Sequence, residues 1–294
     1  MAEAHTDADK YYVPQSSPWP IYGSITLFTL MSGAIATLDG WLPAWALVPG
    51  FAMLALLFIL WFHTVIAENQ RGIYNMAVDR SFRLGMMWFI FSEVMFFAAF
   101  FGALFYARNF SVPWLSGDGV KIFTKLLLWD NYDGVWPTNG PAAVGPRANG
   151  TFETIPAIGL PAINTAILLT SSVTVTIAHH ALITGHRARL KIFLAATFLL
   201  GFTFVGLQAK EYHEAYTELG LQLGTGIYGS TFFMLTGFHG MHVTVGAVML
   251  TVIWFRVMSG HFTPQRHFGF EAVAWYWHFV DVVWLGLFTF VYWL

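Results

Sequence analysis

The chain has no cysteine among its 294 residues. This absence excludes disulfides, iron–sulfur clusters, c-type haem attachment, and zinc or copper sites with thiolate ligands from this chain. Metal sites with histidine ligands remain open, because the sequence contains 11 histidines.

Charged side chains are scarce as well. They make up 10% of the residues, against about 25% in a typical soluble domain, while hydrophobic residues make up 56%. This composition is typical of a polytopic membrane protein. The formal net charge of −2 gives no indication of a surface for nucleic acid.

Long hydrophobic runs are the feature that the chain has in abundance. A transmembrane helix needs about 20 mostly apolar residues to cross the hydrocarbon layer. The sequence predicts an all-α protein, a bundle of seven transmembrane helices, over Trp19–Leu38, Ala46–Ala67, Phe82–Ala107, Ile158–Ile183, Ile192–Leu207, Ile227–Phe255 and Phe268–Leu294.

The distribution of Lys and Arg orients this bundle, since short cytoplasmic segments carry an excess of both. One side holds Lys10, Arg71, Arg80, Arg83, Arg187, Arg189, Lys191, Arg256 and Arg266, while the short segments of the other side hold only Lys210. The long loop on that second side, which counts little, holds Arg108, Lys121, Lys125 and Arg147. We therefore expect a cytoplasmic N-terminus and a periplasmic C-terminus.

Residues 1–18 are polar and acidic with a single Lys, which is the wrong pattern for a signal peptide or a mitochondrial presequence. We expect a short solvated N-terminus there and one transmembrane domain over residues 19–294. A long outer loop, rich in Pro and Gly, is expected at about residues 109–157. Within it, Val120–Trp129 fits a short amphipathic helix at the interface and fits a packed loop segment equally well.

Three ionisable residues interrupt the last hydrophobic run. Glu271, His278 and Asp281 fall within about 80° of helix arc, so they form one polar stripe. An ionisable group at the bilayer centre costs about 2.5–3.5 kcal/mol on insertion scales, so the stripe should face a neighbouring helix. By helical rise, Asp281 lies about 21 Å above His267, and His242 lies a similar distance from Arg256. We therefore expect His278 and Asp281 to pair with the helix that carries His239 and His242.

Glu93 lies about 15 Å along its helix from Arg83, near the middle of the membrane. It fits a proton carrier, a contact to a lipid headgroup or partner, or a buried carboxyl hydrogen-bonded across helices, and a structural or interaction role is favoured. His239 and His242 are three residues apart and fit a metal-binding pair, but nearby glycines favour close helix packing with interhelical hydrogen bonds. We expect no metal site and no catalytic residue in this chain.

Several segments resemble one family, subunit III of the haem–copper cytochrome c oxidases of bacteria and mitochondria. The combination of GFHGMHV at Gly237–Val243 with AWYWHFVDVVW at Ala274–Trp284 is highly specific. Further matching segments are PWP at Pro18–Pro20, SEVMFF at Ser92–Phe97, WP at Trp136–Pro137, the run Leu160–Leu182, LQAKEY at Leu207–Tyr212, YGSTFFMLTGFHGMHV at Tyr228–Val243 and HFGFEAVAWYWHFVDVVWL at His267–Leu285.

The resemblance implies a seven-helix subunit without a cofactor of its own, whose first two helices are splayed from helices 3–7 by a lipid-filled cleft. It implies subunits I and II as partners, with haem a, haem a3 and copper held in those partner subunits. It also implies bound phospholipids, contact with cytochrome c only through the complex, a place in the bacterial inner membrane, and a role in stabilising subunit I and supporting proton uptake.

The resemblance further implies site residues. Glu93 matches a buried carboxylate beside the cleft, and Arg256 and His261 match basic positions that meet phospholipid headgroups. In the segment WFHTVIAE, His63 and Ala67 stand where many relatives carry arginines, so His63 is a doubtful lipid contact. The remaining polar residues, His239, His242, Glu271, His278 and Asp281, are expected to form a buried network that fixes the bundle.

Three other functions fit parts of the pattern. An equivalent subunit of a quinol oxidase has the same bundle, although many such homologues lack the first two helices. A free-standing proton or solute transporter would use Glu93, His239, His242 and Asp281 as a relay. A b-type haem protein would use histidines as axial ligands.

Overall fold

The computed structural model describes residues 11–13, 16–147 and 150–294. Seven helices in this part of the chain are long and apolar enough to cross a membrane, and it contains no strand. The predicted all-α fold and the seven spans are therefore confirmed. Lys10 and most of the expected solvated N-terminus lie outside the described residues. The chain divides into two compact units, residues 1–84 and 85–294, so the expected splay of the first two helices remains a prediction.

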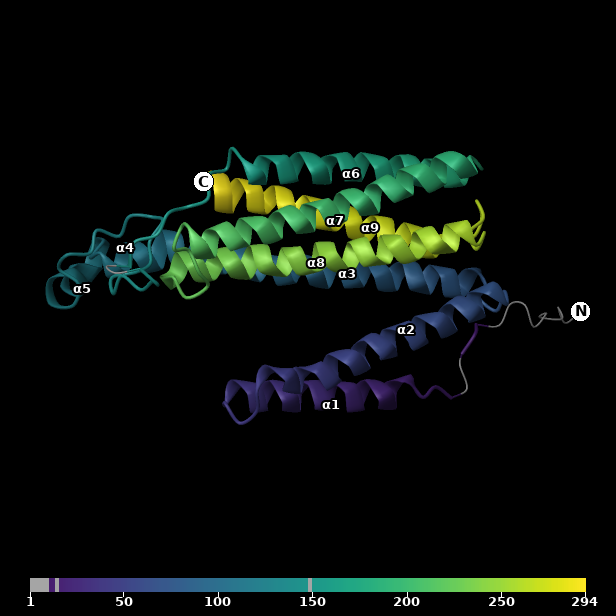
Figure 1. Cartoon of the computed structure of the whole chain (residues 1–294), viewed down its shortest axis with the longest axis horizontal. Coiled ribbons are helices and arrows are strands. Elements are labelled where there is room, and N and C mark those ends of the chain that lie inside the picture. The colour runs from purple at the N-terminus through teal and green to yellow at the C-terminus, as the bar shows by residue number, and fades with distance from the viewer. Residues whose placement is uncertain (1–10, 14–15, 148–149) are drawn as a thin grey trace, which may run out of the picture. The chain divides into compact units, whose positions relative to one another are not determined.

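The first unit is a helical hairpin that leads into a third helix. It contains α1 (Trp19–Leu38), a short 3-10 turn η2 (Ala44–Leu47), α2 (Val48–Gln70) and the first residues of α3 (Met76–Tyr106) (Figure 1). A proline stands in the first turn of both α1 and α2, where its missing N–H costs nothing. A Cβ at Gly50 would lie 2.6 Å from the Leu30 Cα, so glycine permits the close approach of α1 and α2.

The exposed surface of this hairpin is largely apolar. Phe28, Leu38 and Ile59 are among its exposed side chains. The C-terminal end of α2 is held by one carboxylate, because Glu68 accepts hydrogen bonds from Tyr74 at 2.6 Å and from Tyr12 at 3.2 Å. Burial, and then the Glu68 carboxylate, raise the pKa of the Tyr74 phenol above its usual value. The tyrosines thereby tie the segments on both sides of the hairpin to the end of α2.

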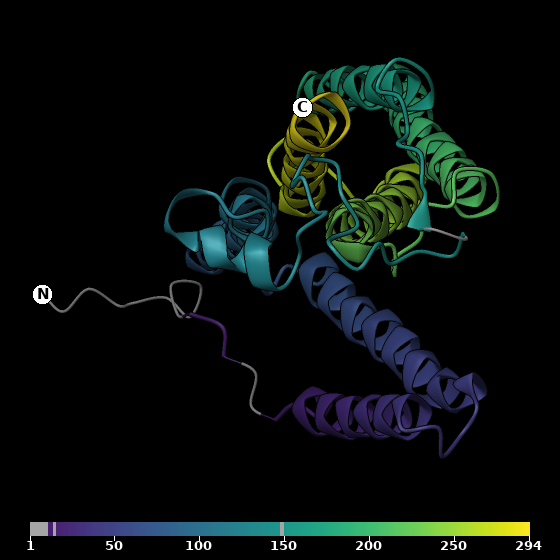
Figure 2. The same cartoon turned by 90° about the vertical axis from the view of Figure 1, so that its left-hand side faces the viewer.

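The second unit contains the remainder of α3 and four long helices. These are α6 (Leu160–Ile183), α7 (Arg187–Thr217), α8 (Gly226–Met258) and α9 (Phe268–Leu287), the last continued by a π-helical segment η6 (Phe288–Trp293). Helix α6 packs on α7, α7 on α8, α8 on α9 and α9 on α6, so the four helices form a closed ring (Figure 2). Helix α3 adds phenylalanines to the ring, such as Phe96 against Phe238 of α8.

The outer loop is more helical than the sequence indicates. After α3 come a π-helical segment η3 (Ala107–Ser111), α4 (Val112–Leu115), a 3-10 turn η4 (Gly119–Lys121) and α5 (Ile122–Leu127). The stretch Val120–Trp129, which fitted a short amphipathic helix and a packed loop segment equally well, thus contains a helix of six residues. Helix α7 is much longer than the predicted Ile192–Leu207, because the charged residues at both ends continue the helix into the interfacial layers.

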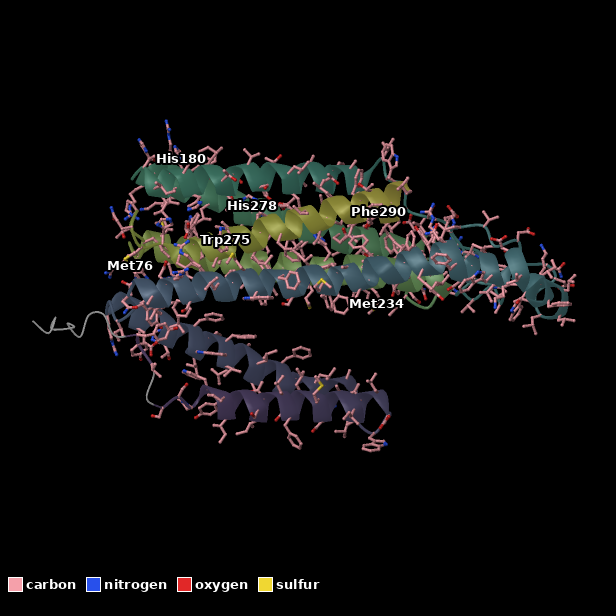
Figure 3. The ribbon with its side chains drawn as sticks, turned by 180° about the vertical axis from the view of Figure 1, so that it is seen from behind. Met76, His180, Met234, Trp275, His278 and Phe290 are labelled. Atoms are coloured by element: carbon pink, nitrogen blue, oxygen red, sulfur yellow. The ribbon has the colours of Figure 1, made fainter. Side chains whose placement is uncertain are left out.

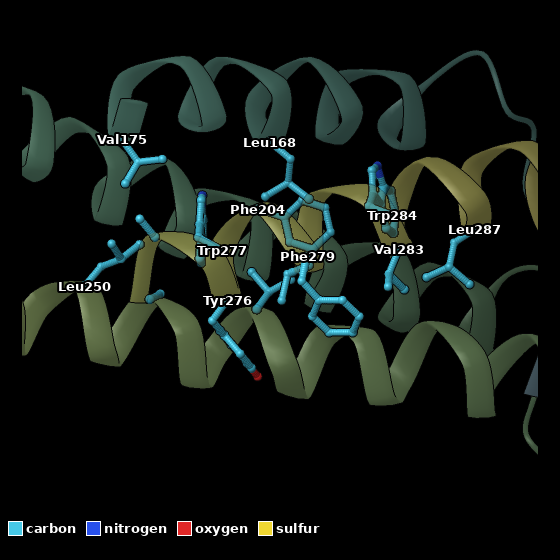
Figure 4. Close-up of a cluster of buried hydrophobic side chains, with 14 of the residues drawn as sticks. Leu168, Val175, Phe204, Leu250, Tyr276, Trp277, Phe279, Val283, Trp284 and Leu287 are labelled. Carbon is cyan, nitrogen blue, oxygen red and sulfur yellow. The ribbon is translucent and has the colours of Figure 1, made fainter. Parts of the chain in front are cut away.

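The centre of the ring is built around Trp277 of α9, which is fully buried (Figure 4). Its indole N–H donates to the Ser171 Oγ of α6 at 2.9 Å. Its ring fills the space over two glycines, since a Cβ would lie 2.6 Å from it at Gly201 of α7 and 2.8 Å from it at Gly246 of α8. One side chain thus joins all four helices of the ring.

We expect Gly201→Ala to destabilise the protein by about 1–3 kcal/mol, because the added methyl group overpacks the core against Trp277. The matched control is Gly206→Ala on the same helix, where a Cβ meets nothing within 4 Å. That control should gain up to about 1 kcal/mol from its better helix propensity. Thermal unfolding of the purified variants measures this difference. A Gly201→Ala melting temperature equal to that of Gly206→Ala would refute this account of the core.

Candidate functional site

Glu93 and His242 form an ion pair or hydrogen bond inside the bundle. The Glu93 Oε2 of α3 lies 2.9 Å from the His242 Nε2 of α8, and the two side chains are 21% and 7% exposed. The rings of Phe96, Phe97 and Tyr276 surround the imidazole. The Glu93 carboxyl group thus has an imidazole partner, a pairing that the sequence analysis did not predict.

The proton between Glu93 and His242 has two possible positions. The His242 Nδ1 lies 2.6 Å from the Phe238 carbonyl oxygen, which can only accept, so Nδ1 carries a proton. The pair therefore holds one further proton, which sits either on Nε2, giving an imidazolium and a carboxylate, or on Glu93, giving two neutral groups. Both arrangements keep the pair neutral overall, which lowers its cost in a membrane.

His239 has a different partner. Its Nε2 donates to the Val280 carbonyl oxygen of α9 at 3.1 Å, and its ring packs against Phe204 and Trp284. His239 is 1% exposed. The two histidines of the GFHGMH segment thus bond to different helices, as expected for interhelical hydrogen bonding.

The polar stripe of α9 faces α6. The His278 Nδ1 lies 2.8 Å from the Ser172 Oγ, and its Nε2 lies 3.4 Å from the Thr176 Oγ1. Asp281 is 4% exposed, and its Oδ2 lies 3.8 Å from the His278 Nδ1. His278 itself has an exposed edge, with 42% of its side chain accessible (labelled in Figure 3).

The expected pairing of His278 and Asp281 with the His239 helix is therefore wrong. The prediction that one neighbouring helix receives the stripe is right, but that neighbour is α6. Helical rise fixed the depth of these residues, and depth does not determine the direction in which a side chain points. On α9, the side that faces α8 is aromatic and includes Tyr276, which stacks on His242.

A second polar cluster lies where α9 begins and α6 ends, at one end of the same interface. Glu271 of α9 lies 3.8 Å from His267 and 4.0 Å from His179 of α6. One ligand atom of each residue lies within 4.8 Å of the others, so the set could hold a metal ion. Sequence reasoning expected no metal and overlooked this set. The sequence feature that could have revealed this set is the four-residue spacing of His267 and Glu271. Both residues are predicted to lie on the same side of the membrane as His179.

Arg256 and His261 lie together at the C-terminal end of α8. The Arg256 guanidinium stands over the Phe262 ring, 4.4 Å from its centre, and its Nε is buried without a hydrogen-bond partner. His261 follows, with its backbone N–H donating to the Arg256 carbonyl oxygen at 3.0 Å. His63 lies on α2 in the other unit, where it is exposed.

We expect Glu93 and His242 to be energetically coupled. Replacing Glu93 by Leu leaves the His242 Nε2 without a partner and should cost about 1–3 kcal/mol, the penalty for an unsatisfied buried polar group. Glu93→Gln keeps a hydrogen-bonding oxygen and should cost less. A double-mutant cycle with His242→Leu, followed by thermal unfolding, should give a coupling energy of about 0.5–3 kcal/mol. Additive effects of the two substitutions would contradict the pairing.

Comparison with known proteins gives one consistent result. The family model described as cytochrome c oxidase subunit III matches residues 9–115 and 123–294. Among curated relatives, the proteins named cytochrome c oxidase subunit 3 of Coturnix japonica, Carassius auratus and Danio rerio are 39%, 40% and 40% identical to the chain. Each alignment spans 287 residues and covers 97% of both chains. With seven membrane-spanning helices and this similarity along nearly its whole length, the chain belongs to the cytochrome c oxidase subunit III family.

Proposed function

We propose that this chain is the accessory, non-redox subunit of a proton-pumping terminal oxidase, which oxidises cytochrome c and reduces oxygen to water. In this proposal subunit I, with its haems and copper, does the chemistry, and subunit II completes the complex. The chain stabilises subunit I, binds phospholipid and supports proton uptake. It lies in a bacterial inner membrane with its N-terminus in the cytoplasm and its C-terminus in the periplasm.

One observation carries the proposal: three ionisable groups inside the helices are each held in a separate contact between helices. Glu93 bonds with His242, His239 bonds with the α9 backbone, and His278 bonds with α6. Asp281 does not connect them, because both of its carboxyl oxygens are buried without a hydrogen-bond partner in the described part of the chain. A transporter that used Glu93, His239, His242 and Asp281 as a relay would need these contacts to be connected, so the geometry supports a structural role instead.

The proposed contact with a partner subunit rests on exposed polar groups. His278 and Thr176 lie next to each other in the middle of the α6–α9 face, and both have accessible surface. Polar side chains that face hydrocarbon are costly, whereas a neighbouring protein helix can supply hydrogen bonds. The α6–α9 face is therefore the proposed contact with a partner subunit.

The proposed lipid contact rests on Arg256. Its guanidinium has a free, buried Nε and an aromatic ring beneath it. A guanidinium fork matches the geometry of phosphate oxygens. A phospholipid headgroup at the inner end of α8 would supply this anion. Glu93, His261 and His63 stay predicted lipid-binding or cleft residues.

Removal of this subunit from the purified complex provides the test. We expect electron transfer to begin at its normal rate, because the redox centres lie elsewhere, while proton uptake slows or the enzyme loses activity sooner during turnover. Stopped-flow oxygen reduction with a pH indicator measures both. An immediate and complete loss of oxygen reduction in a correctly assembled remainder would contradict the proposal.

Two further measurements separate this proposal from its rivals. The chain alone, reconstituted in liposomes, should transport no protons, whereas the transporter hypothesis requires transport. The Glu93→Ala complex should still assemble and keep its haem a absorption, and loss of that absorption would count against an accessory role for Glu93.

A further inference from the structure

A small cavity lies at the end of α7 that is opposite the Glu271 cluster. It has a volume of about 170 Å³ and lies between the end of α7 and the segment that leads into α6. Its walls include Ile155, Pro156 and Pro161, and its polar lining is supplied by three carboxylates, Glu211, Glu214 and Glu218. By the distribution of Lys and Arg, this end of the bundle faces the outside.

Glu211 is the deepest of the three carboxylates. The residue is 2% exposed, and its Oε1 accepts hydrogen bonds from the Tyr292 hydroxyl at 2.6 Å and from the Gln208 amide at 3.0 Å. Its Oε2 is buried and has no hydrogen-bond partner. A buried carboxylate oxygen left in this way carries a full desolvation penalty. An unpaired acceptor at the wall of a cavity therefore calls for a donor or a cation in that cavity.

A second buried oxygen repeats this pattern. Asn164 of α6 is fully buried and donates its amide to the Gln208 Oε1 at 3.4 Å, while its own Oδ1 has no hydrogen-bond partner. Asn164 lies one helical turn beyond Pro161, which lines the cavity. Both unsatisfied atoms are oxygens, so this end of the bundle lacks a hydrogen-bond donor or a positive charge.

The neighbouring basic residues do not remove this deficit. Lys210 lies 3.5 Å from the Glu214 Oε1, and the Glu214 side chain is 36% exposed. Arg147 donates to the backbone carbonyl of Glu218 and lies 3.3 Å from the Glu153 carboxylate. Both cations are thus engaged at the rim, and neither bonds to the buried oxygen of Glu211.

We propose that this cavity is a cation site and that it takes a hard divalent cation, with Ca²⁺ as the best match. The polar lining consists of oxygen ligands, which Ca²⁺ and Mg²⁺ prefer, and it contains neither histidine nor cysteine. Three carboxylates from one helix end do not form the octahedron that Mg²⁺ demands, whereas Ca²⁺ accepts irregular geometry and waters. The cavity has room for the ion together with several waters.

Such an ion would join three parts of the chain. Glu211 is bonded to Tyr292 in the last turn of the protein, and the Leu219 carbonyl accepts the Glu153 backbone N–H from the segment that precedes α6. Neutralising the carboxylates would hold the end of α7, the C-terminal turn and this segment together. The cation is a structural clamp at the outer face and takes no part in electron transfer.

Calcium binding by the purified oxidase complex tests this inference. The complex is stripped with chelator and equilibrated with ⁴⁵Ca²⁺, and bound calcium is counted per haem. We expect the double variant Glu214→Gln/Glu218→Gln to bind one Ca²⁺ fewer than the wild type, or to bind it at least about tenfold more weakly, because affinity depends on ligand charge. Added Ca²⁺ should raise the melting temperature of this subunit in the wild type and not in the double variant.

The controls keep the result decisive. Glu153→Gln removes a carboxylate at the same end that does not line the cavity, and it should bind Ca²⁺ like the wild type. Glu211→Gln should also lose the ion. If that variant does not assemble, calcium binding by the Glu214→Gln/Glu218→Gln variant still tests the inference. Equal calcium binding by the wild type and the double variant would overturn the inference. It would also be overturned if Na⁺ alone raised the melting temperature as Ca²⁺ is expected to do. In the first case a proton on Glu211 and water in the cavity would account for the buried oxygen.

Discussion

The structure depends on the cost of placing polar side chains in hydrocarbon. Each ionisable residue at membrane depth needs a partner within the protein, because the lipid offers none. In the ring of α6–α9 and its neighbour α3, that requirement selects which faces meet. Glu93 fixes α3 to α8 through His242, and His278 fixes α9 to α6 through Ser172. Indole donors add to the second interface, since Trp284 bonds to the Thr165 Oγ1 at 2.9 Å.

Packing and polarity act together in this bundle. The polar contacts specify which helices are neighbours, but they leave the distance between axes to the side chains around them. Gly201 and Gly246 allow α7 and α8 to close over Trp277, while phenylalanines set the spacing of α3. In the same core, small residues therefore let helices approach closely, while aromatic residues keep helices apart. Soluble domains achieve this specificity mainly by burying apolar surface from water, a force that is missing between helices in lipid.

Sequence reasoning reached the fold, but it missed several partners of the site residues. Hydrophobic runs gave all seven spans, and the membrane depth of Glu93 and Asp281 stays a prediction. The partner of each residue depends on the order of helices around the ring and on the rotation of each helix, which a single sequence does not contain. For that reason His278 was assigned to α8 when it contacts α6, and the cluster of His179, His267 and Glu271 was overlooked. The fifth span was predicted too short, because its bounds were set by hydrophobic residues and the helix continues through the charged residues at both ends.

The long outer loop shows where family resemblance stops. The family model leaves out residues 116–122, which contain the turn before α5. This segment exposes Val120, and α5 exposes Phe123 and Leu127. The bundle, in contrast, is matched along its whole length, so the polar contacts described above lie in the part of the chain that the family model covers.

The central claim is that the interior polar groups hold a supporting bundle together and do not conduct protons. Proton pumping by the oxidase complex, measured as protons released per electron in vesicles that contain the double variant Glu93→Gln/His242→Asn, tests this claim most directly. The account predicts an unchanged ratio of protons to electrons together with a lower melting temperature of this subunit. A reduced ratio at unchanged stability would contradict it.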